Sequence, residues 1–196
     1  MESIYGKHLQ ELCDVKDYLV REIEELRSHL SDIGGIDPVE HVLARIKSEE
    51  SMREKCKRKG LEETTQNALE VITDAIGIRV VCAFVDDVYT IRDSLCKLDD
   101  VEVIEEKDYI RHAKVNGYRS FHMILKVKGY YAEIQLRTIS MDTWAALEHH
   151  MKYKKKLNGN EKLITEELKR CADELASTDI SMQTIKDMIV SLPEND

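Results

Sequence analysis

The stretch RSFHMILKVKGYYAEIQLR, Arg119 to Arg137, contains two strand-like runs that meet at Lys128-Gly129. Runs rich in β-branched and aromatic residues on either side of a short polar pair predict a tight β-hairpin. In the second run, apolar and polar residues alternate. Since successive side chains of a strand point to opposite faces, we expect one apolar face packed on helices and one polar face available for chemistry. The apolar positions are Ala132, Ile134 and Leu136, and the polar ones are Tyr131, Glu133, Gln135 and Arg137.

Helical patterns occur on both sides of this hairpin. Apolar residues recur every three or four positions from Leu9 to Leu30, which predicts an amphipathic helix ending at Gly34-Gly35. Asp37-Pro38 is typical of a helix start, so a short helix is expected toward Arg45. Further helices are expected through the basic residues up to Gly60, through Leu69 and Ile72, from Asp86, from Ile139 to Tyr153, and from Glu161 to Val190 after a loop at Asn158-Gly159-Asn160.

Two more strands complete the predicted sheet, the β-branched run Gly77–Val85 and the segment Val101–Glu106. Helices and strands in this order predict an α+β fold: a mixed, largely antiparallel sheet with flanking helices. The 196 residues suit a single domain. We expect an N-terminal helix within residues 1–35, a core at 40–155 and a C-terminal helical region at 161–190.

Composition excludes several classes of protein. The chain is 42% hydrophobic and 34% charged, as expected of a soluble globular domain. No apolar run approaches the roughly 18 residues of a membrane span, and no signal-peptide pattern is present, so a cytoplasmic protein is expected. The five cysteines lack a CxxC pair, which disfavours disulfides and structural zinc. A net charge of −9 argues against a general nucleic-acid binder, because non-specific binding requires a basic surface.

Residues 45–59 differ from this acidic background, with seven Lys or Arg and three Glu. Helical spacing would place Lys47, Ser51, Lys55 and Arg58 near one face. A solvated helix face and a phosphate-binding cluster both fit this pattern. The second is favoured, because Lys and Arg present the charge and donors that suit phosphate oxygens.

Seven motifs between Glu40 and Lys155 follow an order that resembles the RelA/SpoT family of (p)ppGpp synthetases, in particular its single-domain branch, the small alarmone synthetases. The motifs are RIKS (45–48), the basic segment to residue 59, TDAIGIRVV (73–81), DYI (108–110), KVNGYRSFH (114–122), EIQLRT (133–138) and MDTWAALEH (141–149). The resemblance implies a nucleotidyltransferase-like synthetase fold. It also implies transfer of the β,γ-pyrophosphate of ATP to the 3′-hydroxyl of GDP or GTP, giving ppGpp or pppGpp and AMP.

Such a transfer requires Mg²⁺ held by carboxylates and phosphate oxygens. The resemblance implies Asp74 as the principal metal ligand. It implies Glu133 as a second ligand or as the base that orients the 3′-hydroxyl. From the residues alone, Asp74 also fits a turn or cap before a strand, and Glu133 also fits a surface ion pair.

The resemblance places ATP on the first half of the core. Arg45 and Arg79 would sandwich the adenine, since guanidinium planes stack on π faces. From the pattern alone, Arg79 also fits a strand arginine that reaches solvent. The residues implied for the ATP phosphates are Lys47, Ser48, Lys55 and Arg58.

The resemblance places GDP or GTP on the second half, where Tyr118 would stack on guanine. Asn116, implied as an acceptor contact, equally suits a turn before Gly117. Lys114 and His122 would contact phosphates, with Gln135 nearby, and Asp142 and Glu148 would recognise guanine edges. On the helix that carries these two acids, we expect Trp144, Leu147 and Met151 to face the core. His149-His150 does not predict a metal site, because adjacent helical residues point about 100° apart.

Several departures limit what the resemblance implies. The chain has no His-Asp dipeptide, a motif of the hydrolase domain in long family members, so synthesis without degradation is expected. His41 and Leu43 stand where some tetrameric relatives carry an aromatic residue and a threonine in an allosteric pocket, so allosteric activation by pppGpp is not expected. Lys107 replaces an Arg of many relatives and would alter the preference between GDP and GTP.

The long terminal helices, together with the habit of the family, imply a homo-oligomer, a tetramer. From the sequence alone, these helices also fit a role in completing the core of a monomer. Two alternatives to GDP or GTP pyrophosphorylation stay open. One is the same transfer to another acceptor, a tRNA 3′ end or an adenosine nucleotide. The other is a non-catalytic nucleotide- or RNA-binding oligomer, although the charge pattern gives RNA binding no support.

Overall fold

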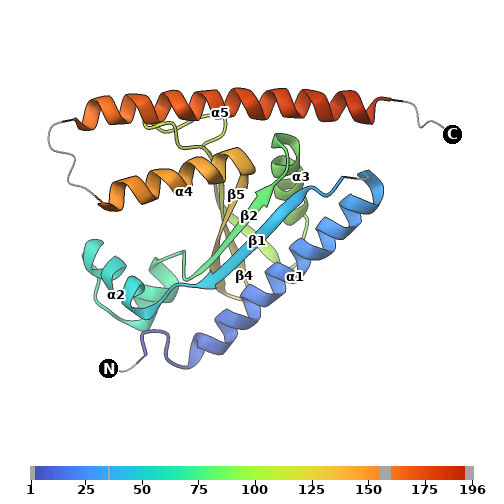
Figure 1. Ribbon diagram of the computed structural model, residues 1–196. Coiled ribbons are helices and arrows are strands. Elements are labelled where there is room, and N and C mark those ends of the chain that lie inside the picture. Colours follow the sequence, from blue (N-terminus) through green and yellow to red (C-terminus); the bar gives the residue numbers. More distant parts are fainter. Residues whose placement is uncertain (1–2, 35, 155–159, 193–196) are drawn as a thin grey trace.

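The computed structural model describes residues 3–34, 36–154 and 160–192. Its centre is one five-stranded sheet in the order β1-β2-β5-β4-β3 (Figure 1). Only the central β2–β5 pair is parallel. The strands are β1 (Val39–Ile46), β2 (Ile76–Cys82), β3 (Val101–Asp108), β4 (Phe121–Val127) and β5 (Tyr130–Thr138). The predicted α+β fold with a mixed, largely antiparallel sheet is confirmed.

Two helices cover the apolar face of this sheet, α1 (Leu9–Gly34) and α3 (Val85–Leu95). Their apolar sides and the inward residues of β2, β4 and β5 form one core, because each element must bury its apolar stripe. Among the fully buried side chains are Leu12, Leu19, Ile23, Ile91 and Met123. In the part of the chain that the structure describes, no helix is both long and apolar enough to cross a bilayer.

Three helices lie outside this apolar layer. The first, α2 (Glu49–Arg58), carries the basic residues and follows β1. The other two, α4 (Ile139–Lys154) and α5 (Glu161–Val190), pack together beyond one end of the sheet (Figure 1). The predicted positions of α1, α4 and α5 are confirmed to within about two residues at each described end, and the predicted start of α3 to within one residue. Gly35 and part of the predicted loop at Asn158-Gly159-Asn160 lie outside the described residues.

The helix expected from Pro38 toward Arg45 is wrong, because this segment is strand β1. Asp37 does accept a hydrogen bond from the backbone N–H of Val39, at 3.0 Å, but it also binds Arg27 and introduces a strand instead of a helix. Antiparallel pairing of β1 along β2 decides the outcome. This non-local ladder overrides a weak local helix signal. The helix expected through Leu69 and Ile72 is a single π-turn at Asn67–Val71.

The expected inner face of α4 is correct only in part. Trp144 is buried, whereas Leu147 and Met151 are 56% and 53% exposed. The indole N–H of Trp144 donates to the carbonyl of Leu168 at 2.9 Å, so α5 covers this part of α4. The second half of α4 extends past the strands (Figure 1), which removes the sheet as a partner for the other two side chains.

Candidate functional site

The register of the strands arranges the polar face of the sheet into rows. Residues paired across neighbouring strands share a face, so each row crosses the sheet from β1 to β3. One row consists of Leu43, Arg79, Gln135, His122 and Lys107. The next row consists of Arg45, Gly77, Glu133, Ile124 and Glu105. The predicted alternation of β5 therefore brings candidate residues from four strands onto one surface.

A cleft of about 360 Å³ opens over the β1–β2 side of these rows. Arg45 and Arg79 border it, and Glu133 and Gln135 line its other side. Gly77 lies between the two arginines, and a Cβ placed there would meet no atom within 4 Å. The missing side chain thus keeps the floor of the cleft open. Two guanidinium groups above a bare floor suit a flat ligand with a π face.

Asp74 stands just before β2 and is held by two lysines. Its Oδ2 lies 2.5 Å from Lys55 Nζ and 3.1 Å from Lys47 Nζ. Its Oδ1 is buried and has no hydrogen-bond partner. Buried polar atoms are nearly always satisfied, so an orphaned carboxylate oxygen indicates a ligand position. Hard cations prefer such oxygens. Among the described residues, no group of three His, Cys, Asp or Glu side chains forms a complete metal cage.

The other predicted phosphate ligands occupy the two ends of α2. Ser48 is the N-cap, and its hydroxyl accepts a hydrogen bond from the backbone N–H of Ser51 at 3.3 Å. Arg58 is exposed in the last turn. The structure therefore brings Lys47 and Lys55 to Asp74, keeps Ser48 beside Lys47 as a cap, and leaves Arg58 at the surface.

Glu133 occupies the middle of the polar face, between the cleft and β4. Its Oε1 lies 3.6 Å from His122 Nδ1, and its Oε2 accepts from Gln135 Nε2 at 3.2 Å. The neighbouring His122 lowers the pKa of the Glu133 carboxyl, burial opposes this shift, and Gln135 and Lys55 add to the lowering. Glu133 is therefore a carboxylate at neutral pH.

Beyond Glu133, aromatic rings form a cluster around Tyr118. The rings of Tyr109 and His122 approach it edge-on, with centroids 6.2 and 5.9 Å away. Lys114 Nζ lies 4.8 Å from the centroid of Tyr118 and 4.5 Å from that of Tyr109. Lys114, Tyr118 and His122, all predicted to bind GDP or GTP, therefore lie in one cluster. Tyr109 was missed as a site residue, although it stands within the DYI motif.

Asn116 combines the two roles that its sequence context left open. Its Oδ1 accepts from the backbone N–H of Tyr118 at 3.2 Å, which is a turn contact. Its Nδ2 donates to Glu148 Oε1 at 3.1 Å, which ties the turn to α4. Gly117 has φ +90°, a conformation that an L residue rarely adopts. The turn therefore fixes the backbone position from which the Tyr118 side chain extends.

Arg137 was not among the predicted site residues, yet it contacts many of them. It is only 4% exposed. Its Nη1 donates to Asp142 Oδ1 at 3.1 Å, and the same oxygen lies 3.2 Å from Arg79 Nη1. Burial lowers the pKa of the Arg79 guanidinium, and the nearby Arg137 lowers it further. Two guanidinium groups that share one carboxylate oxygen make this region electropositive.

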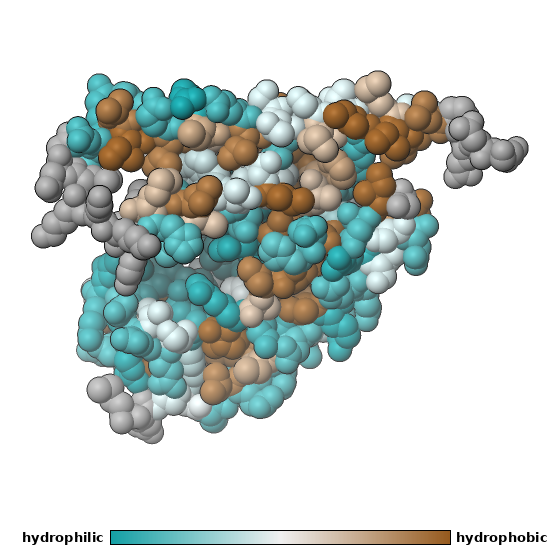
Figure 2. All heavy atoms as spheres, in the orientation of Figure 1, coloured by the Kyte–Doolittle hydropathy of each residue, from teal (hydrophilic) through white to brown (hydrophobic). Residues whose placement is uncertain are grey.

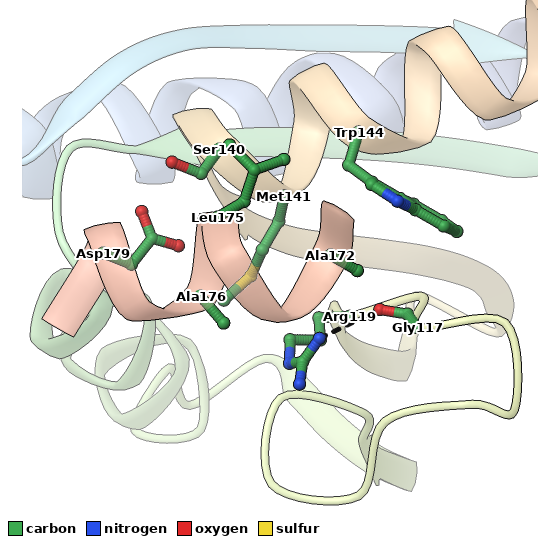
Figure 3. Close-up of a pocket in the computed structure, with 9 residues that line it drawn as sticks. All are labelled: Gly117, Arg119, Ser140, Met141, Trp144, Ala172, Leu175, Ala176 and Asp179. Atoms are coloured by element: carbon green, nitrogen blue, oxygen red, sulfur yellow. Dashed lines mark hydrogen bonds between the residues drawn. The ribbon is translucent and has the colours of Figure 1, made fainter. Parts of the chain in front are cut away.

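Helix α5 supports the Tyr118 loop from outside (Figure 3). Ala172 points toward Gly117, and a Cβ added to Gly117 would lie 2.6 Å from that of Ala172. Arg119 donates to the Gly117 carbonyl and to Asp173 Oδ1 at 2.9 Å. The space left at this contact is about 10 Å³, too little for a ligand. The contact is therefore a packed support and not a binding pocket.

Comparisons with known proteins place the chain in a family. The family model described as "Region found in RelA / SpoT proteins" matches residues 44–158. GTP pyrophosphokinase YwaC of Bacillus subtilis (strain 168) is 42% identical over 163 residues, which cover 79% of this chain and 77% of that protein. GTP pyrophosphokinase YjbM of the same strain is 32% identical over 179 residues, which cover 84% and 83%.

Solved structures give the same result for the fold. Small alarmone synthetase 1 from Bacillus subtilis, bound to its product pppGpp, superposes with a TM-score of 0.81 at 29% identity, covering 94% of this chain and 97% of that one. Small alarmone synthetase 2 from Bacillus subtilis gives a TM-score of 0.79 at 35% identity, covering 93% and 99%. Because the family model matches more than half of the chain and relatives above 30% identity extend over most of it, the chain belongs to the RelA/SpoT family, on its small alarmone synthetase branch.

Proposed function

We propose that this protein is a GTP/GDP pyrophosphokinase that transfers the β,γ-pyrophosphate of ATP to the 3′-hydroxyl of GDP or GTP and releases AMP. The observation that carries the proposal is the position of Glu133. It lines the cleft between Arg45 and Arg79 and also lies beside His122 of the aromatic cluster. One carboxylate lies between two sites, each with positive side chains and each suited to an aromatic base. This arrangement suits a transfer between two nucleotides. The names of the two Bacillus subtilis relatives support the same activity.

ATP is assigned to the cleft and to the lysines next to it. Arg45 and Arg79 would hold the adenine over Gly77, where the floor is open. Lys47 and Lys55 are near enough to Asp74 to contact both a metal and phosphate oxygens. Lysines that already pair with a carboxylate supply the positive charge that a migrating pyrophosphate requires. Ser48 and Arg58 are the remaining proposed phosphate contacts.

Mg²⁺ fits the donors at this place. The buried, unpartnered Oδ1 of Asp74 and the ionised Glu133 are hard oxygen ligands, and Lys55 contributes to the electrostatic environment of both. When bound, Mg²⁺ neutralises phosphate charge and polarises the bond to be broken. Asp74 would hold the ion. Glu133 would be its second ligand or would accept the proton of the 3′-hydroxyl.

GDP or GTP is assigned to the aromatic cluster. The guanine would stack on Tyr118, since this ring stands beside Lys114, whose charge suits acceptor phosphates. His122, edge-on to the same ring, is a further proposed contact of the acceptor. Gln135 borders Glu133 and would contact the acceptor near its reacting hydroxyl. The proposed contacts to guanine edges are Asn116, at the start of the Tyr118 loop, and Asp142 and Glu148 on α4.

Product analysis tests the proposed activity. The purified protein, incubated with ATP, Mg²⁺ and GDP or GTP, is expected to form ppGpp or pppGpp with one AMP per turnover. An acceptor panel that includes tRNA and adenosine nucleotides separates this activity from its nearest alternative. Failure to release AMP with any guanine nucleotide would overturn the proposal. We also propose synthesis without hydrolysis and without activation by pppGpp, with Lys107 affecting the choice between GDP and GTP.

A homotetramer is proposed from the apolar side chains that the terminal helices leave at the surface. Near the C-terminal end of α5, Ile180, Met188 and Val190 are 66%, 63% and 62% exposed. Figure 2 shows hydrophobic surface at this end of α5. Exposed apolar patches of this kind mark association surfaces. Size-exclusion chromatography with light scattering is expected to give a mass near four chains.

Filling the floor of the cleft should weaken ATP binding selectively. Gly77→Leu puts a branched side chain where a Cβ meets nothing within 4 Å, between Arg45 and Arg79. We expect the KM for ATP to rise by at least about tenfold, equivalent to about 1.4 kcal/mol of lost binding. The KM for GDP and the thermal midpoint should change little, because open space accepts the new side chain. Steady-state kinetics with each substrate varied in turn measures this, and an unchanged KM for ATP would contradict the assignment.

A further inference from the structure

Arg137 is a buried cation to which the proposed reaction gives no role. It is 4% exposed and donates four hydrogen bonds to four different side chains. A guanidinium has five N–H donors, no acceptor and a fixed planar geometry. Burying it is costly unless its donors are used. Its partners are Ser120, Asp142, Tyr118 and Gln135.

A first route leads from Arg137 to Glu133 through two hydrogen bonds and one longer contact. Arg137 Nη2 donates to the hydroxyl of Tyr118 at 2.6 Å. That hydroxyl lies 2.8 Å from His122 Nε2, and His122 Nδ1 lies 3.6 Å from Glu133 Oε1. The guanidinium can only donate and the carboxylate can only accept. When His122 is neutral, the two ends favour one polarity: Tyr118 donates its single hydrogen to Nε2, and His122 carries its hydrogen on Nδ1, facing Glu133.

A second route leads to the other oxygen of the same carboxylate. Arg137 Nη2 donates to Gln135 Oε1 at 2.9 Å, and Gln135 Nε2 donates to Glu133 Oε2 at 3.2 Å. The two ends again leave a single orientation. The amide oxygen must face the donor-only arginine, and the amide nitrogen must face the acceptor-only carboxylate.

We propose that Arg137 is a positioning residue that orients the Glu133 carboxylate through both routes and sets His122 in its Nδ1–H tautomer. The proposal rests on the assigned pyrophosphokinase site, but it concerns a residue that touches neither nucleotide. A hydrogen bond from Gln135 on one carboxylate oxygen and the facing Nδ1 of His122 on the other restrict rotation of the Glu133 side chain. Groups held in a productive geometry react faster than mobile ones.

Arg137 is itself fixed from the opposite side. Its Nη1 binds Asp142 Oδ1, and its Nε donates to the Ser120 hydroxyl, which is fully buried. Lysine would supply the charge but not donors in three directions within one plane. The conservative replacement is therefore expected to fail, which separates positioning from a simple requirement for charge.

Nitrogen-15 NMR of labelled histidine tests the tautomer without any turnover. The His122 signals, assigned by comparison with His122→Gln, should show a protonated Nδ1 and an unprotonated Nε2 at alkaline pH. In Arg137→Met they should move toward the average of the two tautomers, because the Tyr118 hydroxyl is no longer held. A wild-type His122 with its hydrogen on Nε2 would overturn the proposal.

Kinetics test the positioning of Glu133. Arg137→Met and Arg137→Lys should each lower kcat by about 10²-fold, with the KM for ATP changed less than about threefold, since geometry at the reacting group is lost. Tyr118→Phe, which keeps the ring and removes only the hydroxyl, should lower kcat by about tenfold. Adding Tyr118→Phe to Arg137→Met should cost no more than about a further threefold, because both act along one route.

Arg92→Met is the matched control. Arg92 also forms a close ion pair, to Glu106 at 2.6 Å, but it belongs to α3 on the opposite face of the sheet. The kcat of the Arg92→Met variant and its His122 NMR signals should equal those of the wild type. Equal kcat for Arg137→Lys and the wild type, or additive losses in the double variant, would refute the proposal. The expected tautomer without any AMP release would refute the proposed function and leave the positioning role standing.

Discussion

Asp74→Asn is expected to lower kcat by about 10³-fold or more, because it removes metal-ion stabilisation worth several kcal/mol. The amide keeps the size of the side chain but loses the charge that two lysines, at 2.5 and 3.1 Å, now balance. Because the two lysines can only donate, the amide oxygen would face them, and the NH₂ group would take the place of the buried, unpartnered Oδ1, the atom best placed to hold a cation. Release of AMP from ATP in the presence of GDP and saturating Mg²⁺ measures the loss.

Asp37→Asn provides the matched control for this prediction. Asp37 also binds a cation, with Oδ2 at 2.6 Å from Arg27 Nη2, but it lies at the surface before β1. Its variant should retain kcat within about twofold, since surface ion pairs contribute little. Equal rates for Asp74→Asn and the wild type would remove Asp74 from the mechanism.

Glu133→Gln is expected to lower kcat by about 10²- to 10⁴-fold, the range for loss of a general base. Its amide cannot accept a proton, and its NH₂ group would face the donors of His122 or Gln135. The lowered pKa of Glu133, caused mainly by His122, keeps the wild-type residue ionised at neutral pH. The variant therefore removes a charge that is fully present under assay conditions.

Glu102→Gln serves as the control, because Glu102 is an exposed carboxylate of β3 opposite Lys126. Its single-turnover rate should match that of the wild type, whereas Glu133→Gln should show the full loss in the same assay. Turnover that survives both Asp74→Asn and Glu133→Gln would mean that the activity does not use this pair of carboxylates.

The sequence predicted best those parts of the fold whose signals are local. The hairpin around Lys128-Gly129 and the long helix α1 follow from periodicities that a buried face imposes on consecutive residues. Strand β1 was mistaken for a helix, because Asp37-Pro38 is a local helix signal whereas its pairing with β2 joins residues far apart. Periodicity also grouped Leu147 with Trp144 on α4. It could not tell that Trp144 is buried and bonded to α5, whereas Leu147 stays exposed.

The same difference between local sequence patterns and non-local packing applies to the candidate site. Motif order gathered the residues proposed to bind nucleotides, and the alternation of β5 put Glu133 and Gln135 on one face. Neither pattern could reveal that Arg137, on that same face, is buried beneath Tyr118 and α4. Neither could they show that Asp142 Oδ1 lies beside two arginines. Such contacts depend on how separate elements pack, which no spacing along the chain records.

The support that α5 gives to the Tyr118 loop bears on where this protein can be divided. The RelA/SpoT match ends at residue 158, before α5 begins at Glu161. Yet Asp179 of α5 accepts a hydrogen bond from Thr138 at 2.6 Å, and both side chains are buried. Removing α5 would strip the loop of its backing at Gly117 and expose the indole of Trp144. We therefore expect the border drawn by sequence similarity not to be a folding border, and the smallest unit able to fold around the proposed acceptor site to extend through α5.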